Sequence, residues 1–261
     1  MIKLITSEKN QLIKDIVKLK QKKEREKTGK FYVEGQRIID EIPSNIKIDK
    51  YIFSKTFYKN IDTNKYDKCK SIIIEDTLFK KISDTINPQG IMAICQIPKI
   101  DINSIKIKEN SFFIILDRIS DPGNMGTIIR TAEALGADAI FLSKGCVDLY
   151  NDKVLRATMG SIFHLPIIEN NDLDYLIDFF KTKKIDVICT YLYGGKPPYE
   201  INMKKSIAIL IGNEANGVLE KYKEKSDYLV KIPMIGKVES MNASISSAIV
   251  FYEVLSQRLK N

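Results

Sequence analysis

Apolar residues in the first hundred positions recur at two spacings, and each spacing predicts a different kind of element. Leu12, Ile16 and Leu19 lie three or four residues apart in a lysine-rich stretch, which predicts a basic amphipathic helix that stops at Thr28-Gly29. Short apolar runs predict strands, and one further helix is expected at 36–42. The predicted strands cover residues 31–33, 48–54, 71–75 and 91–96. Together these elements make a small α/β domain.

Polar and apolar residues alternate between Pro98 and Asn110, which fits either a linker or an edge strand. Beyond it, apolar strands alternate with helices, which is the pattern of a parallel sheet covered on both faces. The predicted strands are 111–117, 139–142, 162–168, 185–191, 206–211 and 227–232. The predicted helices are 127–135, 151–159, 172–182, a short one after Gly217 and a long one at 243–259. We therefore expect two domains, residues 1–98 and 106–261.

The composition is that of a folded protein rather than a disordered one, with 44% hydrophobic and 28% charged residues among 261. Lysine and arginine outnumber aspartate and glutamate by 41 to 33, which gives a net charge of +8. Most of this excess lies at the N-terminus, where residues 1–37 hold 11 basic and 5 acidic side chains. Such a basic segment is compatible with a polyanionic partner but does not by itself identify one.

The four cysteines are far apart in the sequence without CxxC spacing, and His164 is the only histidine. A zinc site or a disulfide framework is therefore not expected, and no metal is predicted. We interpret His164 as a packed strand residue rather than a base. No apolar run approaches the ~20 residues that span a bilayer, and the N-terminus lacks the apolar stretch of a signal peptide. These features predict a reduced, cytoplasmic protein with no membrane partner.

Three loops that follow apolar strands carry the candidate chemistry, because ligands of parallel α/β sheets bind beyond the carboxyl ends of the strands. The first, residues 117–126, contains Asp121-Pro122-Gly123-Asn124 and leads into a helix that carries Arg130. Its glycines allow close backbone approach, and the helix N-terminus offers free N–H groups to an anion. Asn124 and Arg130 could both face such a ligand. The alternative is a plain turn followed by a surface arginine.

The second loop, residues 212–217, begins with Gly212 and places Glu214 where a strand is expected to give way to a helix. The dipole and free N–H groups of a helix N-terminus favour an ionised carboxylate, so Glu214 is either a helix cap or a functional group. The glycine spacing does not match the GxGxxG dinucleotide motif, and the sequence contains no P-loop. A nucleotide-dependent oxidoreductase is thereby excluded.

The third stretch, residues 232–242, leads into the long final helix. Ser240 or Asn242 would cap that helix, and capping is compatible with contact to a ligand. The helix carries an apolar stripe, which we interpret as core packing. The residues of the stripe are Ile245, Ile249, Tyr252, Leu255 and Leu259.

In order and spacing, these three stretches resemble the three motifs of the SpoU (TrmH-type) RNA 2′-O-ribose methyltransferases, of the SPOUT superfamily. The motifs are carried by residues 121–132, 209–217 and 232–242. Arg156-Ala157-Thr158-Met159-Gly160-Ser161 also matches, so the resemblance covers residues 111–258. Residues 20–40, with Gly29-Lys30-Phe31-Tyr32-Val33-Glu34-Gly35, are similar to the substrate-binding domain that precedes the catalytic domain in many of these enzymes.

The resemblance implies an α/β fold with a SPOUT-type parallel sheet and a deep trefoil knot near the C-terminus, preceded by a small α/β RNA-binding domain. It also implies a homodimer. The implied cofactor is S-adenosylmethionine, bound at the positions of Gly212, Ile232 and Met241, the last of which stands where leucine is usual. For catalysis the resemblance points to Arg130 at the ribose 2′-hydroxyl. The other polar motif positions are Asn124, Glu214, Ser240 and Asn242.

The family's proposed base is the arginine, although a guanidinium with a pKa above ~12 is a poor proton acceptor near neutral pH. Either its site lowers that pKa, or Arg130 clamps a phosphate and polarises the hydroxyl. We favour the clamp, with deprotonation late and shared with water. Arginine is scarce in this chain, six residues against 35 lysines, which suggests that Arg118, Arg130 and Arg156 serve planar bidentate contacts.

The sequence therefore predicts an RNA (ribose-2′-O-)-methyltransferase, by resemblance one that acts on 23S ribosomal RNA, with transfer RNA as the alternative substrate and no DNA partner. The lysine-rich N-terminal part would grip RNA phosphates, unless it is only a solvated helix. A competing hypothesis is a non-catalytic RNA-binding protein of the same fold, but the presence of all five polar motif residues favours the enzyme. The loop from Tyr191 to Pro198 has no assigned role, because its tyrosines could contact cofactor or RNA, or only pack.

Overall fold

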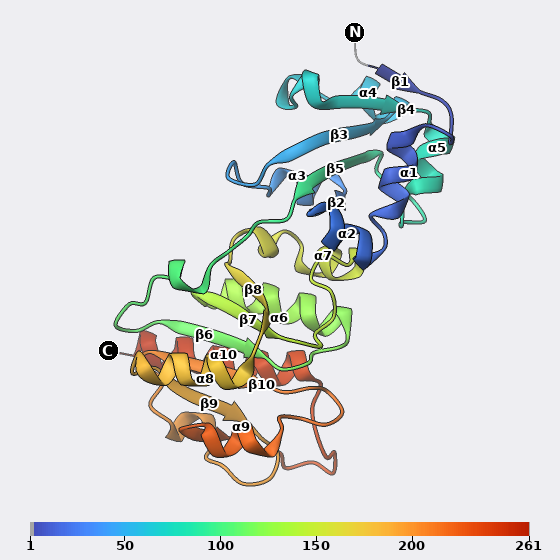
Figure 1. Ribbon diagram of the computed structural model, residues 1–261. Coiled ribbons are helices and arrows are strands. Elements are labelled where there is room, and N and C mark those ends of the chain that lie inside the picture. The colour runs from blue at the N-terminus through green and yellow to red at the C-terminus, as the bar shows by residue number, and fades with distance from the viewer. Residues whose placement is uncertain (1–2, 261) are drawn as a thin grey trace. The chain divides into compact units, whose positions relative to one another are not determined.

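The computed structural model describes residues 3–260 and divides the chain into two compact units, each with its own sheet (Figure 1). The first unit takes in the chain up to Lys99 together with Tyr150–Phe163. The second takes in Ile100–Leu149 and the chain from His164 onward. Residues 98–110, where the chain passes from the first unit to the second, contain one 3₁₀ turn at Ile102–Ser104 and no strand, so they form a linker rather than an edge strand.

The first unit has a mixed five-stranded sheet in the order β1-β4-β3-β5-β2. Its strands are β1 (Lys3–Ile5), β2 (Lys30–Glu34), β3 (Ile48–Ser54), β4 (Ser71–Ile74) and β5 (Ile91–Gln96). Its helices are α1 (Gln11–Lys18), α2 (Lys22–Thr28), α3 (Gln36–Asp40), α4 (Lys55–Asn60), α5 (Asp76–Ile82) and, from the later segment, α7 (Asp152–Thr158). A core formed by Ile16, Ile52 and Phe79 joins α1 and α5 to the sheet.

The single basic helix predicted at the N-terminus is two helices, α1 and α2. The side chain of Asn10 caps α1 by accepting the N–H of Leu12, and Leu12 itself is only partly buried. The other two residues of the predicted apolar face, Ile16 and Leu19, are both buried, and Ile13 is buried beside them. Gly29 ends α2 with a left-handed φ of 63°, which confirms the predicted stop.

The segment 150–163 lies in the second predicted domain, yet it packs within the first unit. The ring of Tyr150 lies 4.5 Å from that of Phe31 on β2. Gly160 approaches Glu41 so closely that a Cβ there would lie 2.7 Å from the Glu41 Cγ. No side chain fits at Gly160, which gives a physical reason for a glycine in the stretch Arg156–Ser161.

The second unit has a six-stranded sheet in the order β11-β9-β10-β6-β7-β8, and every pairing in it is parallel. Its strands are β6 (Phe112–Leu116), β7 (Ala139–Ser143), β8 (Ile167–Asn171), β9 (Asp186–Thr190), β10 (Ile207–Ile211) and β11 (Tyr228–Val230). The predicted parallel α/β sheet is confirmed. The central strands β6 and β10 are buried at every position, which is why they appear in the sequence as unbroken apolar runs.

Helices cover both faces of this sheet. On one face, Phe180 of α8 (Leu173–Thr182) stacks against Phe113 and lies edge-on to Phe141, and Tyr222 of α9 (Glu220–Lys225) joins the same core. On the other, Phe251 of α10 (Ala243–Leu259) lies edge-on to Phe112, with ring centres 5.5 Å apart. There α10 packs against α6 (Pro122–Ala134). The strands β6 and β10 end side by side, so the loops that follow them start at the same edge.

The predicted boundaries of one helix and one strand in the second unit are wrong. The helix expected at 127–135 already begins at Pro122, because the Asp121 side chain caps it by accepting the N–H of Asn124 at 2.7 Å. The strand expected at 162–168 is a 3₁₀ turn at Ser161–Phe163 followed by β8. His164 lies between the two, half-exposed, with Nδ1 3.6 Å from a carboxylate oxygen of Glu133, so it is not a packed strand residue.

The final helix α10 has the predicted bounds but buries a different face. The predicted core stripe is largely exposed, with 56% of Ile245 and 63% of Tyr252 accessible to solvent. The buried residues are Ser244, Ser247, Val250, Phe251 and Val254. The buried face thus combines small serines with Val250, Phe251 and Val254, and most of the predicted stripe is exposed to solvent.

Candidate functional site

A cleft of about 340 Å³ opens at the carboxyl edge of the second unit's sheet. This volume lies within the ~300–1,000 Å³ typical of small-molecule sites. The cleft is lined by the ends of β9, β10 and β11 and by the loops that follow them. All three residues predicted to bind the cofactor, Gly212, Ile232 and Met241, line it.

The loop after β10 forms a small closed turn at the rim of the cleft, which we call the rim turn (residues 213–217). The N–H of Gly217 donates to the carbonyl of Asn213 at 2.9 Å, and Asn213 Oδ1 accepts the N–H groups of Ala215 and Asn216. Gly212 precedes the turn, and a Cβ there would lie 2.4 Å from the Gly217 carbonyl carbon. Only glycine therefore allows this turn to close.

Glu214 projects from the rim turn and holds the loop that follows β6. One carboxylate oxygen accepts the N–H of Asp121 at 3.2 Å and the side-chain amide of Asn124 at 3.1 Å. The other accepts both the N–H and the hydroxyl of Ser120, at 3.3 and 3.1 Å. Glu214 is thus an acceptor for four donors of a loop that lies more than 90 positions earlier in the chain.

The two sequence interpretations of Glu214 were a cap for the helix that follows it or a functional group. The helix that follows, α9, begins only at Glu220, so Glu214 does not cap it. Instead its carboxylate lies beside the N-terminus of α6. Burial on its own would raise the pKa of Glu214, but hydrogen bonds from its own N–H, from Asn124 and from Ser120 and Asp121 outweigh it, so the pKa is lowered.

Asn124 connects Glu214 to the third motif. While its amide nitrogen donates to Glu214, its Oδ1 accepts the amide of Asn242 at 2.9 Å. Asn242 in turn caps α10, because its Oδ1 accepts the N–H and hydroxyl of Ser244. Glu214, Asn124 and Asn242 form one hydrogen-bonded chain that joins the three predicted motifs.

Ser240 and Arg130 lie outside this chain. Ser240 lines the cleft on the loop before α10. Arg130 is exposed in the middle of α6, does not line the cleft, and has no hydrogen bond or ion pair within residues 3–260. The structure therefore brings together three of the five predicted catalytic residues, places a fourth at the cleft, and leaves the guanidinium available to a ligand.

Sequence reasoning did not assign the wall of the cleft formed by Tyr191, Leu192 and Tyr193. The ring of Tyr191 lies 3.9 Å from the ammonium of Lys223 and 5.9 Å from the ring of Tyr193. The available signal was their position directly after β9, at the same sheet edge as the other loops. The loop that begins at Tyr191 thus contributes to the cleft.

Between residues 3 and 260, no three histidine, cysteine or acidic side chains come close enough together to hold a metal ion. None of the helices in that range is long and apolar enough to cross a membrane. The four cysteines are free thiols.

Comparisons with known proteins agree with the three motifs. The sequence profile of the SpoU rRNA Methylase family matches residues 111–252, and that of an MRM3-like substrate binding domain matches residues 10–93. The chain is 36% identical to the 23S rRNA (guanosine(2553)-2′-O)-methyltransferase RlmP of Bacillus subtilis, over 97% of this chain and 99% of that protein.

Solved structures give the same result. The crystal structure of AdoMet-bound rRNA methyltransferase from Sinorhizobium meliloti matches with a TM-score of 0.87 and 30% identity, covering 97% of each chain. The SpoU methyltransferase AviRb from Streptomyces viridochromogenes matches with a TM-score of 0.86 and 25% identity, covering 96% of this chain and 98% of that one. The resemblance inferred from the motifs is confirmed, and the chain belongs to the SpoU rRNA methylase family.

Proposed function

We propose that this protein is an S-adenosylmethionine-dependent methyltransferase that methylates a ribose 2′-hydroxyl of 23S ribosomal RNA. The observation that carries the proposal is the chain Glu214–Asn124–Asn242, which joins all three family motifs beside a cleft of suitable size. The name of the Bacillus subtilis relative, which aligns over nearly the whole chain, supports ribosomal RNA as the substrate.

The cleft fits the proposed cofactor. Gly212 offers bare backbone, and Ile232 and Met241 offer apolar surface, while the polar groups of the rim turn and Ser240 line the same cleft. A mixture of apolar walls with a few directed polar groups is typical of cofactor sites. When bound, S-adenosylmethionine supplies a methyl group on a sulfonium, an electrophile that needs an oxygen aligned behind it.

The polar residues of the motifs then divide into two roles. Glu214 positions rather than accepts a proton, because four donors already occupy its carboxylate and its pKa is lowered. Asn124 and Asn242 transmit that position to the start of α10. Arg130, with its guanidinium free within the described residues, clamps a phosphate of the RNA and polarises the 2′-hydroxyl.

We place the RNA-binding domain in residues 1–98 and the catalytic domain in residues 106–261. Residues 1–37 hold 11 basic and 5 acidic side chains, and this excess of positive charge supports RNA rather than protein as the binding partner of the first domain. Nothing in the chain favours DNA. Because ribosomes are assembled in the cytoplasm, the proposed activity belongs there.

We also propose a trefoil knot and a homodimer. The path of the chain supports the knot: after β10 it runs to β11 at the far sheet edge and returns to α10 beside α6. The exposed stripe of α10 supports the homodimer, because a groove alongside it is lined by Ile245, Ile249 and Tyr252 together with Thr127 of α6. A second copy would bury this face, and Arg130 lies one turn beyond Thr127.

A comparison of ribose-methylation maps tests the substrate. Total ribosomal and transfer RNA would be mapped from strains with and without the gene. We expect one 2′-O-methyl group to be lost from 23S ribosomal RNA. Loss of a methyl group from transfer RNA instead would identify transfer RNA as the substrate. Unchanged maps together with no binding of S-adenosylmethionine would indicate a non-catalytic RNA-binding protein.

A further inference from the structure

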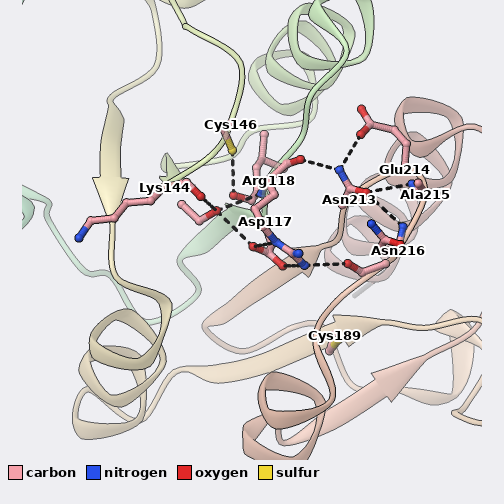
Figure 2. A network of polar contacts seen from close by, with 12 residues as sticks. Asp117, Arg118, Lys144, Cys146, Cys189, Asn213, Glu214, Ala215 and Asn216 are labelled. Carbon is pink, nitrogen blue, oxygen red and sulfur yellow. Dashed lines mark hydrogen bonds and ion pairs between the residues drawn. The ribbon is translucent and has the colours of Figure 1, made fainter.

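Arg118 touches the rim turn at both of its ends (Figure 2). Its Nη2 donates to the carbonyl of Gly217 at 3.2 Å, and its own carbonyl accepts the side-chain amide of Asn213 at 2.8 Å. Asn213 and Gly217 are the residues whose backbone hydrogen bond closes the turn. One residue at the end of β6 therefore holds the first and the last residue of a turn formed almost a hundred positions later.

The guanidinium of Arg118 is aimed by its neighbour Asp117. Nε and Nη2 donate to the two carboxylate oxygens of Asp117 at 3.0 and 2.7 Å, and only 2% of Asp117 is exposed. The Arg118 N–H donates to Ser143 Oγ at 3.0 Å, and that hydroxyl lies 3.2 Å from the Asp117 carboxylate. This bidentate geometry fixes the plane of the guanidinium group, whose N–H donors form a fork. A lysine cannot reproduce such a planar pair of donors.

The backbone of Arg118 is in a conformation that favours glycine. Its φ is +54°, a left-handed value that costs energy in any residue with a Cβ. The stem of its side chain passes close to Gly145, where a Cβ would lie 3.3 Å from Arg118 Cγ. An arginine held in a strained conformation points to a use for its side chain.

The rim turn depends on such polar contacts for its position. Glu214, Ala215, Asn216 and Gly217 are all exposed, so apolar packing contributes little there. The contacts that remain are those of Glu214 with residues 120–124 and those of Arg118. Since every residue of the turn lines the cleft, a shift of the turn changes the shape of the cleft.

We propose that Arg118 is a positioning residue for the cofactor site: its fork, oriented by Asp117, holds the rim turn against the cleft. This inference rests on the proposed function, because it takes S-adenosylmethionine as the occupant of the cleft. It assigns Arg118 no contact with the cofactor itself. Arg118 lies outside the polar motif positions, and its bidentate partner is the carboxylate of Asp117.

Two variants separate positioning from simple stability. Arg118→Lys leaves a cation beside Asp117 but cannot donate to Asp117 and Gly217 together. Arg118→Gly removes the side chain and relieves the left-handed φ. Lys144→Ala is the matched control, because it removes a neighbouring exposed cation whose side chain points away from the network (Figure 2).

Calorimetry would measure S-adenosylmethionine binding without RNA, and methyl transfer would be assayed on total ribosomal RNA from a strain lacking the gene. We expect Kd and KM for the cofactor to rise about 10-fold in both variants, because each loses the charge-assisted hydrogen bond from Arg118 to Gly217. The kcat at saturating cofactor should stay within about twofold of wild type. Amide hydrogen exchange at residues 213–217 should become faster in both variants, and Lys144→Ala should change none of these quantities.

Cofactor affinity within twofold of wild type in a folded variant would overturn the inference, as would a fall in melting temperature with unchanged affinity and exchange. The two proposals fail separately. If the wild type does not bind S-adenosylmethionine, the proposed function fails. If the wild type binds and the variants bind equally well, only the role of Arg118 fails.

Discussion

Glu214→Gln is the sharpest test of the hydrogen-bonded chain between the motifs. The substitution keeps the shape of the side chain but removes the charge and replaces one acceptor oxygen by an N–H₂ group. That group would face either the N–H of Asp121 and the amide nitrogen of Asn124, or the N–H and hydroxyl of Ser120, and of these only the hydroxyl can accept a hydrogen bond. At least one donor of the loop after β6 then loses its partner.

The size of the effect follows from these contacts. A hydrogen bond to a charged group contributes about 1.5–3 kcal/mol, and the exposure of Glu214 brings the expected loss to about 1–2 kcal/mol. A loss of this size corresponds to a factor of roughly 5–30. We expect kcat to fall by about this factor, because Asn124 and Asn242 are no longer held in register, while the cofactor Kd changes less than about threefold.

The assay combines calorimetry of S-adenosylmethionine binding with methyl transfer to ribosomal RNA that lacks the modification. Glu239→Gln is the matched control, since Glu239 lines the same cleft but makes no hydrogen bond to residues 118–124 among the described contacts. A Glu214→Gln enzyme with normal kcat and only weakened cofactor binding would refute the positioning role. Equal losses in the Glu239 variant would show that charge at the cleft, rather than the hydrogen bonds, matters.

Four further predictions address other parts of the site. Arg130→Lys should lower kcat about 100-fold, because a point charge does not reproduce the planar fork, and near wild-type turnover would disprove the clamp. Gly212→Ala should abolish cofactor binding in calorimetry, since its Cβ would lie 2.4 Å from backbone, whereas Gly236→Ala, with open space around it, should bind normally. Ile249→Asp should turn a dimer into a monomer in light scattering, and an unchanged mass would remove the α10 face as the interface. The pKa of Glu214 is lowered in the fold, so the contribution of its charge to the free energy of unfolding is complete above the unfolded pKa of about 4.3 and is lost as the pH falls through the folded pKa. The free energy of unfolding of Glu214→Gln should therefore fall less steeply at acid pH than that of the wild type. Near neutral pH the two curves of unfolding free energy against pH should run parallel.

The sequence predicts most of the second unit's sheet, because buried parallel strands are unbroken apolar runs. β6 and β10 are buried at every position and lie within the predicted ranges. The error at 162–168 has a local cause: Met159 and Gly160 both adopt left-handed φ values, and the chain turns before β8 begins. A left-handed methionine leaves no mark in the hydrophobic pattern.

The sequence singles out residues that the structure brings together, but it does not predict how they are connected. Asn124 contacts Glu214 across 90 positions and Asn242 across 118. Local patterns such as capping and periodicity describe neighbours within a few residues, so they indicate that Glu214 is a cap of the next helix or a functional group but not which distant residues it contacts. The structure assigns its carboxylate to the N-terminus of α6, where the same physical preference for negative charge applies to a different helix.

The error in α10 is informative in a different way. Helical periodicity correctly finds the stripe Ile245, Ile249 and Tyr252, but a stripe indicates which residues favour burial and does not say what buries them. In this unit the buried face of α10 is formed instead by Ser244, Ser247, Val250, Phe251 and Val254. Exposed apolar residues that share a groove with Thr127, one turn before Arg130, favour a partner surface at this point. If that partner is a second copy, the contact that completes the burial of α10 lies one turn from Arg130, the residue proposed to clamp the RNA.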